Sequence, residues 1–172
     1  FFKTTGLFYL LSSLPYALTQ NAFLVIKIFG PLLFGVLCFM MYLYARRGLG
    51  WNGWKSLLVA VLVGTYFVSL TVSWMMYRQM LGLIFLMAAL LSLKLLSSPR
   101  RYYVATAFMV LTVLSHELAS VILFFVVGVE AVRFLVKKSK KDFAYLAFSL
   151  VLPVALFFFQ RYSPQWTQWF SV

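Results

Sequence analysis

Acidic residues are almost absent from this chain of 172 residues, which has three Asp and Glu side chains against fifteen Lys and Arg. A single cysteine excludes an internal disulfide and a thiolate metal cluster. Charged residues make up only 10% of the sequence, whereas hydrophobic residues make up 64%. Soluble domains carry roughly 45–50% apolar and about 25% charged residues, so a water-soluble fold is excluded. We expect an integral membrane protein that crosses the bilayer several times.

The net charge of +12 does not indicate nucleic-acid binding, because the basic residues lie at the ends of apolar runs. This placement is typical of the cytoplasmic loops of membrane proteins. The sequence therefore predicts that the loops at 46–55, 94–101 and 137–142 are cytoplasmic, and that no nucleic acid is a partner.

The apolar runs predict an all-α, polytopic transmembrane helical bundle of about six to seven helices. Lipid offers no partners to backbone polar groups, so helices must satisfy them internally. A hydrocarbon core ~30 Å thick needs ~20 helical residues to cross it. We expect one domain over 1–172, part of a longer membrane protein, in which residues 4–18 either span or lie partly inserted on the outer face. The predicted helices cover residues 4–18, 22–46, 55–74, 79–97, 100–115, 118–136 and 142–160.

Two of these helix boundaries follow from length alone, because no Gly or Pro marks them. As single helices, residues 55–97 would extend ~64 Å and residues 100–136 ~54 Å. Both lengths far exceed the hydrocarbon thickness, so the chain must turn near SWMMYRQ and near SHEL. Since the basic loops lie at the other ends of these helices, both turns are expected on the extracytoplasmic face.

The two outer turns contain the ionisable side chains that we consider as a binding site. Charged groups at membrane depth are costly and tend to bind a ligand or line a cavity. A guanidinium can hold a phosphate through two parallel hydrogen bonds. We therefore predict a lipid-phosphate site formed by Arg78 and His116, with Lys27 as a further candidate and Gln79 and Glu117 as secondary ones.

Structural roles compete with these assignments. Arg78 and Lys27 can extend toward the headgroups from a helix end, and His116 with Glu117 can simply mark a turn. His116 and Glu117 begin an H-E-x-x-H pattern, but Ser120 stands where the second histidine is required, which excludes a zinc metalloprotease site. No metal ligand and no catalytic residue is assigned within the chain.

Three stretches occur in an order known from one family of membrane enzymes. They are TTGLFYLLSSLPYALTQNAFLVIKIFGPLLFGVLCFMMYLYARRGLG, WKSLLVAVLVGTYFVSLTVSWMMYRQMLGLIFLMAALLSL and LTVLSHEL. A helix with a PL-Y-LL-A-like pattern, a polar break, a long helix ending in Y-x-x-A-R-R, an Arg-bearing outer turn and a later L-S/T-H segment follow one another. Over roughly residues 4–125 the chain resembles part of a GT-C glycosyltransferase, a polytopic enzyme that uses sugars linked to polyprenyl or dolichyl phosphate.

The resemblance implies transfer of a sugar from a lipid-phosphate carrier to an acceptor on the extracytoplasmic face. It implies that Arg78 lies near the lipid phosphate and that His116 is a weaker match to a polar residue lining the pocket. Glu117 stands where the family often has Pro or a small residue. The family's catalytic carboxylate lies in an outer loop before residue 4, and no acid precedes Glu117 here. We therefore expect that carboxylate outside this stretch.

The implied partners are membrane lipids, the polyprenyl- or dolichyl-phosphate-linked sugar and other membrane subunits. The cofactor stays open, and would be a divalent metal if the enzyme is of the metal-dependent type. Two other functions remain alternatives: a non-catalytic structural subunit of a membrane complex, and a fragment of a transporter. A transporter would need discontinuous helices or acids at the bilayer midplane.

Overall fold

The computed structural model describes residues 7–66, 77–95 and 100–162, and these ranges are helical almost throughout. They contain seven α-helices and one π-helical turn, with no strand in the ranges described, which confirms the all-α prediction. The elements are α1 (Leu7–Thr19), α2 (Ala22–Leu43), η1 (Tyr44–Gly48), α3 (Gly53–Thr65), α5 (Tyr77–Leu95), α6 (Arg100–Ser115), α7 (Glu117–Val136) and α8 (Lys140–Tyr162).

Four helical stretches are long and apolar enough to cross a membrane, so the chain is a membrane protein. They are Ala22–Gly48, Tyr77–Leu95, Glu117–Val136 and Lys140–Gln160, with 27, 19, 20 and 21 residues. By contrast, α1 and α3 have 13 residues each. A helix of that length extends only ~20 Å, less than the hydrocarbon thickness. Within the described residues, neither helix is long enough to cross the hydrocarbon core.

The two boundaries predicted from length differ in outcome. The turn predicted near SHEL is present, with α6 ending at Ser115 and α7 beginning at Glu117. Near SWMMYRQ, residues 73–76 lie outside the described ranges. Here α5 begins at Tyr77, so Arg78, which was expected in the connecting loop, belongs to the first turn of α5 together with Gln79. The helix starts earlier than expected because a helical backbone forms its own hydrogen bonds, whereas the bilayer core offers none to a loop.

The helix expected over 55–74 is also shorter in the ranges described. It begins at Gly53, where the Asn52 side chain accepts a hydrogen bond from the Lys55 amide, 2.9 Å away. It ends at Thr65, because Tyr66 has an extended backbone with ψ 124°. The remaining residues of that prediction, 67–74, lie outside the described ranges.

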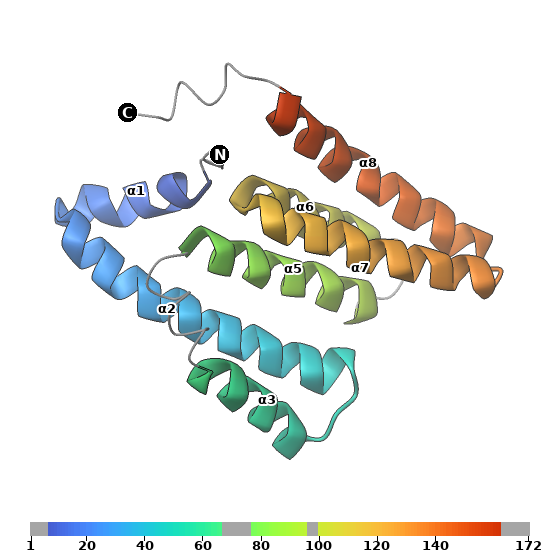
Figure 1. Ribbon diagram of the computed structural model, residues 1–172, viewed down its shortest axis with the longest axis horizontal. Coiled ribbons are helices and arrows are strands. Elements are labelled where there is room, and N and C mark those ends of the chain that lie inside the picture. The colour runs from blue at the N-terminus through green and yellow to red at the C-terminus, as the bar shows by residue number, and fades with distance from the viewer. Residues whose placement is uncertain (1–6, 67–76, 96–99, 163–172) are drawn as a thin grey trace.

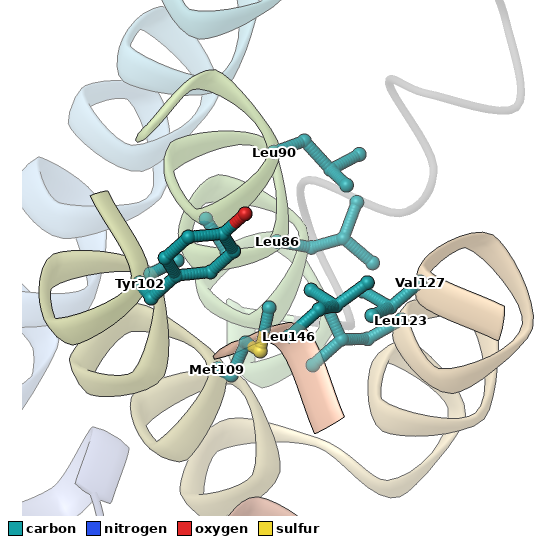
Figure 2. Packing of buried hydrophobic residues seen from close by; sticks show 9 residues of the cluster. Leu86, Leu90, Tyr102, Met109, Leu123, Val127 and Leu146 are labelled. Carbon is teal, nitrogen blue, oxygen red and sulfur yellow. The ribbon is translucent and has the colours of Figure 1, made fainter. Parts of the chain in front are cut away.

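Helix α5 lies at the centre of the bundle and contacts α2, α6 and α7 (Figure 1). Helix α5 runs parallel to α2. At the start of α5, Tyr77 contacts Gly30 of α2, and near the end of α5, Lys94 lies 5.5 Å from the ring of Tyr44, which follows α2. The core shared by α5 to α8 is drawn in Figure 2. In lipid, such packing depends on van der Waals contact and on small residues that let helices approach. The labelled core residues are Leu86, Leu90, Tyr102, Met109, Leu123, Val127 and Leu146.

The basic segments gather at one end of the bundle, which we call the basic end. It comprises η1, the end of α5, the start of α6 and the α7–α8 turn, residues 137–139. The Lys94–Tyr44 contact joins α5 to η1, and an ion pair between Arg101 and Asp142 joins α6 to α8. The described parts of the three loops expected in the cytoplasm thus lie together. Their assignment to the cytoplasm stays a prediction.

Candidate functional site

The end of the bundle opposite the basic end contains Arg78, half-buried in the first turn of α5. Its Nη2 donates a hydrogen bond to the Tyr9 hydroxyl at 3.4 Å, and its guanidinium lies 5.3 Å from the centroid of the Tyr9 ring. A cation–π contact of this kind stabilises by about 0.5–1 kcal/mol at exposed sites. Tyr9 of α1 therefore helps to fix the position of the Arg78 guanidinium.

Aromatic packing fixes the position of α1 and hence of Tyr9. The Phe8 ring stacks on Tyr77 with centroids 5.8 Å apart, and meets Phe29 edge-on at 6.4 Å. On α2, a Cβ at Gly30 would lie 2.8 Å from Cε1 of Tyr77, so only glycine leaves room for that ring. One aromatic cluster thus joins α1, α2 and α5 through Phe8 and Tyr77, which precede Tyr9 and Arg78 in the chain.

His116 is the single residue between α6 and α7, and it begins the second of these helices. Its backbone is extended, with φ −159° and ψ 133°, and its Nδ1 accepts a hydrogen bond from the Leu118 amide at 3.2 Å. A side chain that accepts from the first amides of a helix is an N-cap, which satisfies a donor that has no partner within the helix. Because Nδ1 accepts, the neutral imidazole carries its hydrogen on Nε2.

The electrostatic surroundings of His116 link it to Arg78. Burial lowers the pKa of the imidazole below its ordinary value of 6.5, and the positive charge of Arg78 lowers it further, while the Glu117 carboxylate opposes both. Burial disfavours the charged form, and so does a cation nearby. The imidazole is therefore neutral at neutral pH, and Nε2–H is a hydrogen-bond donor on the same end of the bundle as Arg78.

Close packing of α5 on α7 places these two side chains on one surface. Gly82 lies one turn after Arg78 on the same face of α5. A Cβ at this glycine would lie 2.8 Å from Cβ of Ala119 and 3.2 Å from Cβ of His116. The absence of a side chain at Gly82 lets α5 approach the start of α7. Arg78, on the same face of α5, is thereby brought toward His116.

The structure treats the remaining predicted residues differently. Glu117 is half-buried as the first residue of α7, and its charge acts on His116. Gln79 is half-buried in the first turn of α5. Lys27 is exposed on α2 and makes no hydrogen bond or ion pair with the residues described. The structure therefore brings together Arg78, His116 and Glu117, with no contact that joins Lys27 to them.

Sequence reasoning missed two residues that the structure makes prominent. Tyr9 gives no signal, since its contact with Arg78 joins residues 69 positions apart. Asp142 does have a signal, because S-K-K-D at 139–142 is a capping-box pattern before an apolar run. Its carboxylate pairs with Arg101 and accepts hydrogen bonds from Tyr102 at 2.8 Å and Ser139 at 2.7 Å.

The candidate site thus contains a guanidinium bonded to a phenolic hydroxyl, and a neutral imidazole that is affected by the charges of that guanidinium and of one carboxylate. Among the described residues, no group of three or more His, Cys, Asp or Glu side chains is placed to hold a metal ion. No protein-family model, curated protein or solved structure matches this chain.

Proposed function

We propose that Arg78, Tyr9 and His116 bind the phosphate of a lipid-linked sugar, and that the chain is part of an integral membrane glycosyltransferase. The observation that carries the proposal is the Arg78 guanidinium, held against Tyr9 and close enough to His116 to lower its pKa. Guanidinium is permanently charged and matches the geometry of phosphate.

The chemistry of the group fits a phosphate that leaves as an anion. Fixed cations and hydrogen-bond donors, placed where negative charge develops, stabilise the transition state of such a transfer. Arg78 supplies the cation, and Nε2–H of the neutral His116 supplies a donor. Activation of the sugar acceptor needs a general base, which the resemblance puts in an outer loop before residue 4.

The surroundings of the site fit a ligand with a lipid tail. Helix α1 presents exposed apolar side chains next to Tyr9, including Leu10 and Leu14, at 68% and 71% exposed. A polyprenyl or dolichyl chain can lie against such a surface within the bilayer while its phosphate reaches Arg78. The ligand would approach sideways from the membrane, and the acceptor from the extracytoplasmic side.

The proposal is tested by Arg78→Ala in the full-length protein, with Arg133→Ala as the matched control. Arg133 lies on α7, 57% exposed, in a local pair with Glu130 at 3.4 Å. Loss of a hydrogen bond to a charged group costs about 1.5–3 kcal/mol. We expect Arg78→Ala to weaken binding of a polyprenyl phosphate roughly tenfold to a hundredfold and to abolish most sugar transfer, with the control unchanged.

Two further ligands make the experiment decisive. A polyprenol without phosphate should bind wild type and Arg78→Ala equally weakly, since the cation then has nothing to hold. If Arg78→Ala binds the phosphorylated lipid as well as wild type does, the assignment of the site is refuted. If binding depends on Arg78 but the full-length protein transfers no sugar, the chain is a non-catalytic lipid-binding subunit.

A further inference from the structure

The basic end contains a hollow that the proposed site does not use. It lies at the α7–α8 turn and has a volume of about 560 Å³. Figure 1 shows this turn where α7 and α8 meet. This volume falls in the range of small-molecule sites, ~300–1,000 Å³. Its lining consists of Phe134, Leu135, Lys138, Ser139, Lys140 and Phe143.

The surface that lines the hollow is mainly apolar, and two of the six lining residues are lysines. Phe134, Leu135 and Phe143 supply the apolar part, and Leu135 is 55% exposed among other lipid-facing residues of α7. The lysines Lys138 and Lys140 flank Ser139 at the rim, and neither makes an ion pair with a described residue. Such a surface suits a molecule with one anionic group and one apolar group.

The acids near the hollow do not neutralise these lysines. Asp142 is paired with Arg101 and bonded to Tyr102, and it also accepts the Ser139 hydroxyl. Glu130, one turn before the hollow on α7, is paired with Arg133. Each described carboxylate at this end thus has an arginine, and the lysine charges remain for a ligand.

The backbone of the turn holds Lys138 in a left-handed conformation, which is unfavourable for a residue with a side chain. The Ser139 amide donates to the Phe134 carbonyl at 3.1 Å and the Lys138 amide to the Leu135 carbonyl at 3.0 Å, the Schellman pattern that ends helices. Lys138 accordingly has φ +56°, a region that favours glycine. A lysine at this position is therefore strained, and the strain is consistent with a charge required there.

We propose that this hollow binds the headgroup of an anionic membrane phospholipid. The phosphate would lie between the Lys138 and Lys140 ammonium groups, and the upper acyl chain against Phe134, Leu135 and Phe143. The position supports this occupant, because α7 and α8 are both long and apolar enough to span a membrane, and a turn that joins two spanning helices lies at the level of the headgroups. Basic groups beside membrane helices attract anionic lipids in this way.

The test uses the full chain, purified in detergent micelles, and native mass spectrometry to count bound lipids. The probes are phosphatidylglycerol and the zwitterionic phosphatidylcholine. The variant Lys138→Gln/Lys140→Gln removes both charges of the rim. Its matched control, Lys137→Gln/Lys141→Gln, removes two charges from the same part of the chain, at residues that do not line the hollow.

We expect wild type and control to retain one tightly bound phosphatidylglycerol, and the rim variant to bind it at least about tenfold more weakly. A third variant, Leu135→Trp, fills the hollow without changing charge and should also lose the lipid. Circular dichroism and the thermal midpoint show whether each variant is folded.

Three results would overturn the proposal. Equal losses in the rim and control variants would mean diffuse attraction to the surface and no defined site. Equal binding of phosphatidylcholine would remove the role of the lysines. Equally tight binding of glycerol 1-phosphate, which has no acyl chain, would show that the apolar lining contributes nothing and that the ligand is a free phosphate.

Discussion

Replacing Gly82 with alanine tests whether close approach of α5 to the start of α7 forms the candidate site. The new Cβ would lie 2.8 Å from Cβ of Ala119, whereas carbon atoms pack best at about 3.5–4.0 Å. Both atoms are fixed to helical backbones, so neither can rotate away. The two helices must therefore separate by about 1 Å.

The magnitude follows from two opposing terms. Overpacking costs about 1–3 kcal/mol, and replacing a helical glycine by alanine returns about 1 kcal/mol. The second term is measured separately by Gly128→Ala on α7, where no atom lies within 4 Å of the new Cβ. The difference between the two variants is then the overpacking term itself, about 1–3 kcal/mol.

The assay is thermal unfolding in detergent, followed by circular dichroism. With about 2–4 °C per kcal/mol for a chain of this size, the midpoint of Gly82→Ala should lie roughly 2–12 °C below that of Gly128→Ala. The same variant should bind the lipid phosphate more weakly, because Arg78 moves away from His116 with α5. Equal midpoints, or a higher one for Gly82→Ala, would refute the reasoning.

Three other outcomes are expected from the charged groups. Asp142→Asn leaves Arg101 without its counter-ion and should lower the free energy of unfolding by about 1–3 kcal/mol. Glu130→Gln, whose partner Arg133 is 57% exposed, should change that free energy by less than about 1 kcal/mol; equal effects would contradict the structure. The pKa of His116 is lower in the folded state than in the unfolded state, so the unfolded state binds more protons as the pH falls below 6.5. The free energy of unfolding should therefore decrease on acidification, and denaturant titrations at pH 7.5 and 5 measure this decrease. His116→Asn should show a smaller dependence of the free energy of unfolding on pH. Lys138→Gly should raise the unfolding midpoint by the equivalent of about 1 kcal/mol by relieving the positive φ, and no gain would mean that the turn is not strained.

The fold could be predicted from the sequence because the bilayer imposes simple lengths. The polar cluster SHEL had to be a turn, since a single helix of ~54 Å far exceeds the ~30 Å hydrocarbon core. The grouping of basic segments at one end followed from the alternation of helices. The end of α3 at Thr65 could not be predicted, because the sequence continues as an apolar run without Gly or Pro up to residue 72.

The site was only partly accessible to sequence reasoning. Arg78 and His116 stood out because charge is rare at membrane depth, and their location at one end required only the helix count. The contact of Arg78 with Tyr9 depends on how α1 packs, which periodicity does not reveal. The sidedness of the loops, the lipid-phosphate ligand and the sugar transfer stay predictions.

The connection between α6 and α7 consists of His116 alone, which limits the substitutions that this residue can accept. His116 caps the start of α7 and, in the proposed site, also faces the ligand, so no further residue between α6 and α7 separates the two roles. Substitution at His116 is then confined to short side chains that accept a backbone amide, such as Asn, Asp, Ser or Thr. An acidic member of that set would sit beside Arg78 and cancel its charge, which leaves a narrow choice for any relative that keeps an anionic ligand.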